Sequence, residues 1–290
     1  MVDPRARSLR SWLYVPGDRE DVLGKAFSRG ADAVILDLED AVAPDRKQIA
    51  RRLVGAALDL APRNGSPSVW VRVNATDLAA DIGAVAHPAL AGVVLAMADL
   101  DRIAELDELL RAVEAGGDTS RVIALVPLIE TARGLAEVAA LARGSRVRNL
   151  ALGEADLAAE LGIDQRDGTA VAVVRMPLVV ASAAAGIFAP TGPTSTDYRD
   201  LDALRASTRA LVRQGFRARS AIHPAQVGVI NDVLTPSPAD VAHARAQVAA
   251  FEAAGGGATR GADGIMVDAA TVRAARDVLA RAAAAGIMER

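Results

Sequence analysis

The sequence predicts an α/β fold, namely a TIM (β/α)8 barrel with a C-terminal helical extension. Eight short apolar runs alternate with longer segments of helical spacing, which is typical of βα units. The 290-residue length suits one large barrel followed by a tail. No G-x-G-x-x-G motif opens a helix after the first run, which disfavours the competing doubly wound, dinucleotide-binding fold.

Each expected strand is a short apolar run that ends at a polar residue, a proline or a turn. The intervening segments have helical spacing, as in Glu20–Gly30 and Leu201–Gly215. The seventh run has the weakest pattern. The eight expected strands are Ser11–Pro16, Ala31–Leu38, Ser68–Asn74, Ala91–Met97, Val122–Glu130, Val147–Glu154, Ala185–Pro190 and Arg219–Pro224.

The tail divides the chain into a predicted barrel domain, residues 1–235, and an extension, residues 236–290. An Ala-rich helix, a Gly-rich linker (Gly255–Gly261) and another helix follow the barrel. The linker leads to ADGIMVD, a small apolar turn that presents one acid, Asp268. We hypothesise that this tail caps the barrel of a neighbouring subunit. Alternatively, it folds back on its own barrel and Asp268 is the N-cap of the last helix.

Composition excludes several classes of protein. Hydrophobic residues make up 51% of the chain, which supports a large core and argues against disorder. The net charge of −3 and the 3% aromatic content give no reason to expect nucleic acid. With no cysteine, disulfides, zinc thiolate sites and a cysteine nucleophile are excluded. The N-terminus lacks a signal-peptide core, and no uninterrupted apolar stretch is long enough to span a bilayer. We therefore expect a cytoplasmic enzyme with no nucleic-acid or membrane partner.

Polar side chains stand at the ends of most of the expected strands. In a parallel barrel these ends share one face, on which barrel enzymes build their active sites. Solvent exposure alone would put a polar residue at any single strand end, but it explains a series of them poorly. The residues are Asp37, Glu39, Asp40, Arg72, Asn74, Glu130, Glu154, Asp156 and His223.

Glu130 and Asp156 are the candidate metal ligands. They follow consecutive strands, so their carboxylates can converge on one ion. Mg²⁺ is usually held by one or two carboxylates, with water and substrate oxygens completing its octahedron. Zinc or copper is harder to accommodate in a chain with three histidines and no cysteine. The alternative is that both carboxylates pair with arginines.

Arg72 lies inside an otherwise apolar strand, so it needs a carboxylate partner. That partner is Asp37 or Glu39, or else a substrate carboxylate held in a bidentate fork. The two lysines, Lys25 and Lys47, fall in the first helix and after a loop rather than on a strand. A Schiff-base mechanism is therefore disfavoured, and no G-x-S-x-G elbow supports acyl-enzyme hydrolysis.

Taken in order, seven segments of the chain resemble the HpcH/HpaI aldolase and citrate lyase β-subunit family, on its CitE-like, CoA-ester-lyase side. The resemblance covers nearly the whole chain and implies a TIM barrel. The segments are WLYVPGDREDVLGKA, GADAVILDLEDAVAPDRK, VWVRVN, VPLIETARG, LGEADLAAELG, GFRARSAIHPAQV and ADGIMVDAATV.

The resemblance implies that Mg²⁺, with Mn²⁺ as a substitute, binds to Glu130 and Asp156. It also implies that Arg72 grips the carboxylate of a 2-oxo acid and that Asp40 lines the same pocket. Asp37 and Glu39 would then hold Arg72, Lys47 or metal-bound water.

Three further residues match the family's motifs. Arg19 and Lys25 match a basic pair near the CoA-derived part of the substrate. Asp268 matches an acid that can reach the active site of a neighbouring subunit, so the resemblance implies a homo-oligomer, a trimer or hexamer.

The implied activity is metal-assisted cleavage of a 3-hydroxyacyl-CoA such as citryl-CoA, malyl-CoA or citramalyl-CoA, or the reverse condensation. Asp268 is the candidate acid for the resulting enolate. The alternatives are a malyl-CoA-type thioesterase, an aldolase acting on free 2-oxo acids, and a non-catalytic binding subunit. Two departures affect the pocket rim: Met97 replaces a lysine that ends the fourth strand in many relatives, and Pro190 and Thr191 replace an acid of the seventh.

Overall fold

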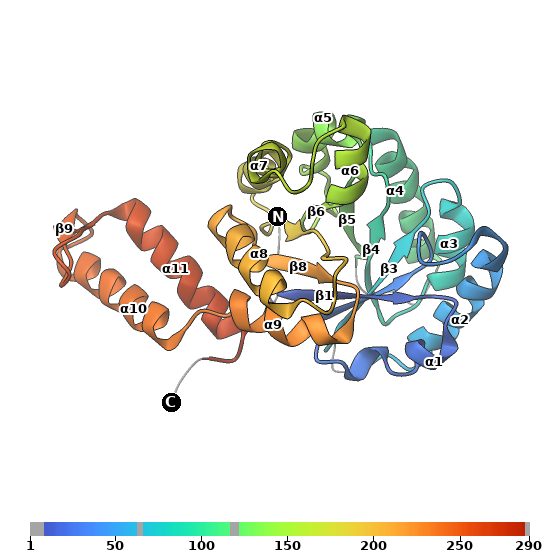
Figure 1. Cartoon of the computed structure of the whole chain (residues 1–290), viewed down its shortest axis with the longest axis horizontal. Coiled ribbons are helices and arrows are strands. Elements are labelled where there is room, and N and C mark those ends of the chain that lie inside the picture. The colour runs from blue at the N-terminus through green and yellow to red at the C-terminus, as the bar shows by residue number, and fades with distance from the viewer. Residues whose placement is uncertain (1–8, 63–65, 117–121, 288–290) are drawn as a thin grey trace. The chain divides into compact units, whose positions relative to one another are not determined.

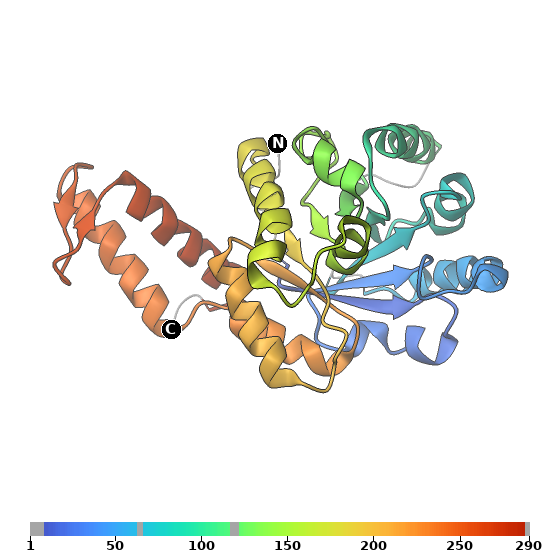
Figure 2. The same cartoon turned by 45° about the horizontal axis from the view of Figure 1, so that its top comes forward.

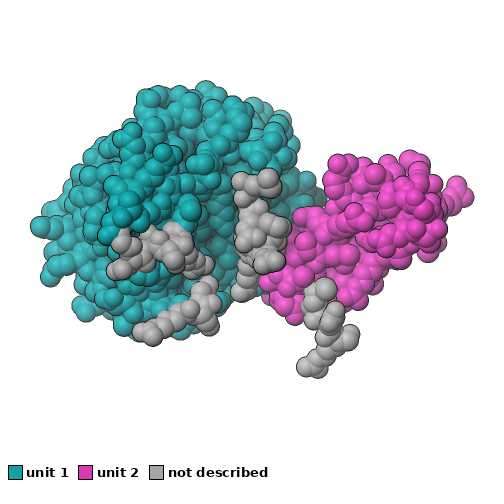
Figure 3. Space-filling view, turned by 180° about the vertical axis from the view of Figure 1, so that it is seen from behind, with its two compact units in different colours: residues 1–231 teal, residues 232–290 magenta. Residues whose placement is uncertain are grey.

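The computed structural model describes residues 9–62, 66–116 and 122–287. The chain divides into two compact units, residues 1–231 and 232–290 (Figure 3). The assignment of the first as a catalytic domain and of the tail as a cap on a neighbour stays a prediction.

The first unit is a closed barrel of eight parallel strands in sequential order, so the predicted TIM barrel is confirmed. Strands β2 and β3 illustrate the register, with Asp37 beside Arg72 at their carboxyl ends. The strands are β1 (Ser11–Pro16), β2 (Ala33–Asp37), β3 (Ser68–Val73), β4 (Leu90–Leu95), β5 (Ala124–Ile129), β6 (Ala151–Leu152), β7 (Thr191–Gly192) and β8 (Ala218–Ala221).

The expected seventh strand, Ala185–Pro190, is wrong. Ala185 is the last residue of a helix that ends at Gly186, whose φ of 68° is left-handed and suits glycine. The true strand, β7, begins at Thr191, whose N–H donates to the carbonyl of Leu150 (2.8 Å). The apolar run therefore forms the end of a helix and a loop, and strand β7 after it is too short to produce a recognisable sequence pattern.

Helices surround the strands in Figures 1 and 2. Side-chain caps begin several of them: Asp99, Thr131, Asp167 and Asp200 each accept hydrogen bonds from the first turn of the following helix. The helices are α1 (Glu20–Leu23), α2 (Lys47–Asp59), α3 (Leu78–Val85), α4 (Leu100–Ala115), α5 (Ala132–Leu141), α6 (Glu154–Leu161), α7 (Gly168–Ala185), α8 (Leu201–Arg213) and α9 (Pro224–Leu234), with 3₁₀ turns at Ala26–Ser28 and Pro44–Arg46.

Helix α7 has 18 residues and a mean hydropathy of 1.6, so by length and composition it could cross a membrane. The expectation concerned an uninterrupted apolar stretch, and α7 passes this test although it contains Arg175. One such helix is weak evidence for a span, because core helices of soluble proteins pass the same test. Here Arg175 lies in the middle of α7 and pairs with Glu154 of α6 at 2.6 Å. A cytoplasmic location stays a prediction.

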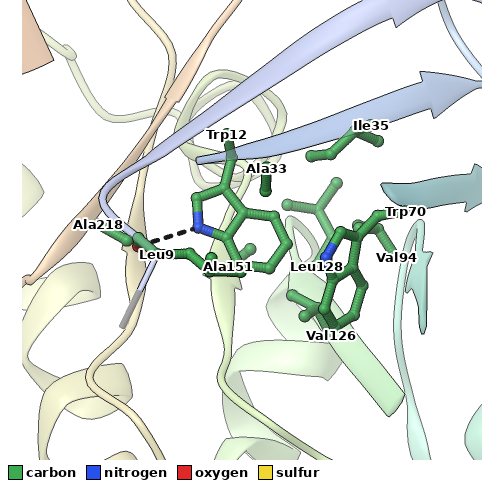
Figure 4. Packing of buried hydrophobic residues seen from close by; sticks show 10 residues of the cluster. All are labelled: Leu9, Trp12, Ala33, Ile35, Trp70, Val94, Val126, Leu128, Ala151 and Ala218. Carbon is green, nitrogen blue, oxygen red and sulfur yellow. Dashed lines mark hydrogen bonds between the residues drawn. The ribbon is translucent and has the colours of Figure 1, made fainter. Parts of the chain in front are cut away.

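Two tryptophans fill the barrel interior. The rings of Trp12 and Trp70 lie 4.9 Å apart between centroids, among aliphatic side chains from most of the strands (Figure 4). Their indole N–H groups donate to the carbonyl of Leu9 and the hydroxyl of Ser68. Gly92 of β4 is required beside them, because a Cβ there would lie 2.3 Å from a ring carbon of Trp70.

The second unit is a helical hairpin, in which α10 (Pro238–Ala253) packs against α11 (Ala269–Ala284). Between them β9 (Thr259–Arg260) and β10 (Met266–Val267) form a small antiparallel sheet, so the Gly-rich linker ends in a strand. Asp268 is the N-cap of α11 and accepts hydrogen bonds from the N–H and hydroxyl of Thr271 (2.8 and 3.0 Å). Its predicted role in a neighbour's active site remains to be tested.

Candidate functional site

The first unit has a cavity of about 760 Å³ at the carboxyl ends of its strands. Its wall includes residues at or just beyond the ends of seven of the eight strands, all except β4. The structure brings four of the predicted site residues to this cavity: Asp40, Arg72, Glu130 and Asp156. This is the face on which barrel enzymes build their sites.

Glu130 follows β5 and is only 5% exposed. Its Oε1 accepts the backbone N–H of Met97 at 2.6 Å, and its Oε2 accepts no hydrogen bond from the described residues. Burial, opposed by that hydrogen bond, raises the pKa of Glu130 from 4.5 to about 8. A buried carboxylate with one free oxygen at a cavity is suited to bind a cation or a proton.

Two neighbours fix the position of Glu130. Met97, which stands where many relatives have a lysine, has a φ of 46°, the one left-handed non-glycine residue in the described part of the chain. Gly153 lies on the other side, where a Cβ would come within 2.6 Å of Oε2. The backbone on both sides is therefore shaped around this carboxylate.

Asp156 lies in the first turn of α6 and is exposed on the cavity wall. Its charge contributes to the raised pKa of Glu130, which shows that the two carboxylates interact. Glu154 faces Arg175 instead and accepts two hydrogen bonds from it. No cluster of three or more histidine, aspartate or glutamate side chains suited to a metal occurs in the described residues. Two carboxylates at a wet cavity still fit Mg²⁺, which takes most of its ligands from water and substrate.

Arg72 is bound by the protein's own carboxylates. Its Nε and Nη2 donate to the two oxygens of Asp37 at 2.7 and 2.6 Å. Its Nη1 contacts Glu39 at 2.8 Å and Asp40 at 3.4 Å, and the ring of Tyr14 lies 5.0 Å away. Burial lowers the pKa of Arg72, but Asp37 more than offsets this and keeps the group charged. The expected alternative, pairing with Asp37 and Glu39, is thus present, and a substrate could replace the weak contact with Asp40.

The acidic stretch after β2 is ordered by this cluster. Asp37 also accepts the backbone N–H groups of Glu39 and Ala41. Burial, partly opposed by Arg72, raises the pKa of Glu39 to about 7. Lys47 donates to the carbonyl oxygens of Leu38 and Glu39 at 2.7 Å, so it holds the main chain and not the carboxylates.

The remaining predicted residues lie elsewhere. Arg19 is exposed and pairs with Asp21 at 2.9 Å, and Lys25 is exposed; neither lines the cavity. Thr191, at a departure from the family pattern, is buried and accepts a hydrogen bond from Asn149 (3.0 Å). Asp268 belongs to the second unit.

Two cavity residues, Arg175 and Arg219, had no predicted role. An arginine in the middle of the apolar helix α7 and another inside the motif RSAIHP were the available signals. As with Arg72, a charge within an apolar element requires a polar or charged partner.

Comparison with known proteins agrees with the fold and the motifs. The family model HpcH/HpaI aldolase/citrate lyase matches residues 10–224. A (3S)-malyl-CoA thioesterase of Cereibacter sphaeroides is 35% identical over 97% of this chain and 96% of its own. The citrate lyase subunit beta of Escherichia coli is 33% identical over 98% and 97%.

Solved structures give the same answer. The crystal structure of CitE from Mycobacterium tuberculosis in complex with magnesium, acetoacetate and coenzyme A superimposes with a TM-score of 0.77. It is 30% identical in sequence, and the match covers 96% of this chain and 99% of that one. From its barrel, its ordered motifs and these similarities, the chain belongs to the HpcH/HpaI aldolase/citrate lyase family and is an enzyme of this carbon–carbon lyase family.

Proposed function

We propose that the chain is a Mg²⁺-dependent lyase that cleaves a 3-hydroxyacyl-CoA into an acyl-CoA and a 2-oxo acid, or forms it. Citryl-CoA, malyl-CoA and citramalyl-CoA fit this scheme, and Mn²⁺ can replace Mg²⁺. The observation that carries the proposal is the buried carboxylate of Glu130, which shares a cavity with Asp156 and Arg72. The complex of the related CitE with magnesium, acetoacetate and coenzyme A supports it.

Glu130 and Asp156 would hold the metal. When bound, Mg²⁺ supplies Lewis-acid stabilisation of negative charge on a substrate oxygen. Glu130 must lose its proton to bind a cation, and its raised pKa makes this proton exchange part of metal loading. Asp156, exposed in the cavity, stays accessible to solvent and substrate.

Arg72 would orient the 2-oxo acid. Asp37 holds its guanidinium in place, and Nη1 points to the 3.4 Å contact with Asp40, which is 67% exposed. A substrate carboxylate would displace Asp40 from this contact. We assign Asp40, once freed, as the base that takes the proton of the 3-hydroxyl group.

The proton balance of cleavage requires both a base and an acid. The 3-hydroxyl group loses a proton, the bond between C2 and C3 breaks, and the thioester enolate gains a proton at C2. We assign the last step to Asp268 of a neighbouring subunit. Hydrogen bonds from Thr271 lower the pKa of Asp268, so it is ionised in an isolated chain. Burial against a neighbour would raise its pKa and let it act as an acid.

A thioesterase acting on malyl-CoA is the second candidate, because a relative of that name is 35% identical over nearly the whole chain. It would use the same cavity, but water would attack the thioester carbonyl. The products differ: with malyl-CoA, the lyase gives glyoxylate and acetyl-CoA, whereas hydrolysis gives malate and CoA.

The deciding experiment is a panel of CoA thioesters incubated with Mg²⁺, with the products identified by mass spectrometry. The lyase proposal expects a 2-oxo acid and an acyl-CoA, and loss of activity in excess EDTA and in Glu130→Gln. Full activity in EDTA would contradict the metal assignment. Turnover of free 2-oxo acids, with no protection by CoA against heat, would indicate an aldolase. No turnover of any thioester would favour a non-catalytic subunit.

The trimer or hexamer in which the tail caps a neighbour is tested by mixing two inactive variants, Glu130→Gln and Asp268→Asn. If Asp268 acts in trans, exchanging subunits should restore activity, because some sites combine an intact metal pair with an intact neighbouring acid. A ring closed by this heterologous contact is a trimer at its simplest. No recovery despite proven exchange, or a fully active monomer by light scattering, would contradict it.

A further inference from the structure

One wall of the cavity contains a buried positive charge that forms no ion pair with a carboxylate of the described residues. Arg219 of β8 is 4% exposed. Its Nε and Nη1 donate to neutral groups alone: the carbonyls of Pro193 and Leu204 and the hydroxyls of Ser207 and Thr208, at 2.6–3.1 Å. Among the described residues it has no ion pair. The guanidinium groups of Arg72, Arg146 and Arg175 differ, since each pairs with a carboxylate.

The third nitrogen of Arg219, Nη2, has no hydrogen-bond partner in the part of the chain that the structure describes. It is also absent from the fully inaccessible, unsatisfied atoms there. Because Arg219 lines the cavity, Nη2 has access to a ligand. Burial, reinforced by the nearby charge of Arg175 and opposed by that of Glu154, lowers the pKa of Arg219 to about 10, so the group remains charged at neutral pH.

The surroundings of Arg219 are positive and rich in hydroxyl groups. Arg175 lines the same part of the cavity, and Glu154 neutralises that arginine through two hydrogen bonds. Glu154 bonds directly to Arg175 and acts on Arg219 only through its charge at longer range. Ser207 supplies a hydroxyl group that contacts Arg219, and Thr194 also lines the cavity. A guanidinium with a free N–H edge and nearby hydroxyls is the usual setting for a carboxylate or phosphate.

We infer that the cavity wall around Arg219 is an oxyanion-binding subsite, separate from the Glu130–Asp156 pair. It would bind a carboxylate or phosphate group through Nη2 of Arg219. The anion offsets the cost of burying an unpaired charge. That the anion is part of the substrate, either a second carboxylate of the acyl chain or a phosphate of CoA, rests on the proposed function. The subsite itself does not.

Ser207→Asp is the sharpest test, because Ser207 is exposed on α8 and its hydroxyl lies 2.8 Å from Nη1 of Arg219. An aspartate there would give the arginine a permanent counterion. Ser207→Asn is the matched control, of nearly equal size but without charge. Arg219→Met removes the charge itself, but it also removes four hydrogen bonds, so its fold must be checked by circular dichroism.

The first measurement is the melting temperature of the metal-free protein in inorganic phosphate or succinate, against chloride at equal ionic strength. At about ten times its Kd, an anion should raise the melting temperature of the wild type by about 3 °C. Ser207→Asn should keep this shift. Ser207→Asp should lose it and should melt higher than Ser207→Asn in chloride. A wild type with no anion-specific shift, or an undiminished shift in Ser207→Asp, would overturn the inference.

Two further arms separate the subsite from the proposed function. Glu130→Gln should keep the anion-induced rise in melting temperature, because anion binding involves no turnover. If the wild type shows this rise but turns over no thioester, only the proposed function is refuted. The bound group is identified by comparing KM values for thioesters with and without a distal carboxylate, and for pantetheine thioesters that lack the CoA phosphates. Ser207→Asp should raise KM about tenfold for substrates that carry this group and leave the others unchanged. An equal effect on all of them would contradict a substrate-bound anion.

Discussion

Gly153→Ala should disable the metal pair without removing any functional group. The new Cβ would lie 2.5 Å from Cβ of Glu130 and 2.6 Å from its Oε2, distances that real Cβ atoms essentially never show. Glu130 must therefore move by about 1 Å to reach ordinary van der Waals contact. Backbone strain is not the cause, because the φ of Gly153 is −92°, which alanine can adopt.

The size of the effect follows from that displacement. Moving Glu130 disturbs the 2.6 Å hydrogen bond from Met97 and displaces the free oxygen that would bind the metal. A 1 Å misplacement of a catalytic group can cost about 100-fold in rate, so we expect kcat/KM and Mg²⁺ affinity to fall by about this factor. Overpacking should also lower the free energy of unfolding by about 1–3 kcal/mol.

Calorimetric Mg²⁺ titration, steady-state kinetics and thermal melting on the same preparations measure these quantities. Gly83→Ala is the matched control, because Gly83 lies inside α3 with no atom within 4 Å of a new Cβ. That control should keep activity and gain about 0.5–1 kcal/mol of stability from helix propensity. A folded Gly153→Ala protein with wild-type Mg²⁺ affinity and turnover would refute the reasoning.

Three other predictions concern the same site. Because burial raises the pKa of Glu130 to about 8, the apparent Kd for Mg²⁺ should rise about tenfold per pH unit below that value and level off above it. The metal-free protein should lose stability as pH rises from about 4.5 through 8, because the folded state keeps a proton on Glu130 that the unfolded state loses. A pH-independent Kd by calorimetry, or the same loss of stability in Glu130→Gln, would contradict this. Arg72→Lys should lose most of kcat/KM and about 1–3 kcal/mol of stability, because an ammonium cannot reproduce the two parallel hydrogen bonds to Asp37. Unchanged activity despite a lower melting temperature would make Arg72 purely structural. Met97→Val should weaken Mg²⁺ binding and stability more than Met97→Ala, because a β-branched residue tolerates the left-handed φ of 46° poorly; equal melting curves and Mg²⁺ titrations would count against backbone control of Glu130.

The barrel was predictable because its strands are buried on both faces and read as apolar runs. The prediction failed where a strand was too short for a pattern: β7 has two residues, and the preceding apolar run belongs to α7 and a loop. The expected helix Glu20–Gly30 likewise divides into α1 and a 3₁₀ turn. These differences shift one strand and divide one helix without changing the topology.

The candidate site was predictable where chemistry follows strand order, as it does for Glu130 and Asp156. It was not predictable where geometry depends on side-chain direction. Nothing in the sequence shows that Asp37 would occupy the fork of Arg72, or that the partners of Arg219 would be carbonyl and hydroxyl groups. The left-handed conformation of Met97 also carries no sequence signal, since methionine does not favour it.

The two lysines have a consequence for a protein that handles activated acyl groups. Thioesters acylate free amines without a catalyst, whereas guanidinium groups stay protonated and inert at neutral pH. The chain has 33 basic residues, and all but Lys25 and Lys47 are arginines. Lys47 is tied to two carbonyl groups and to Asn74, and Lys25 is exposed. Among its lysine side chains, accidental self-modification by an acyl-CoA should therefore concentrate at Lys25, and peptide mapping after incubation with such a thioester would reveal it there.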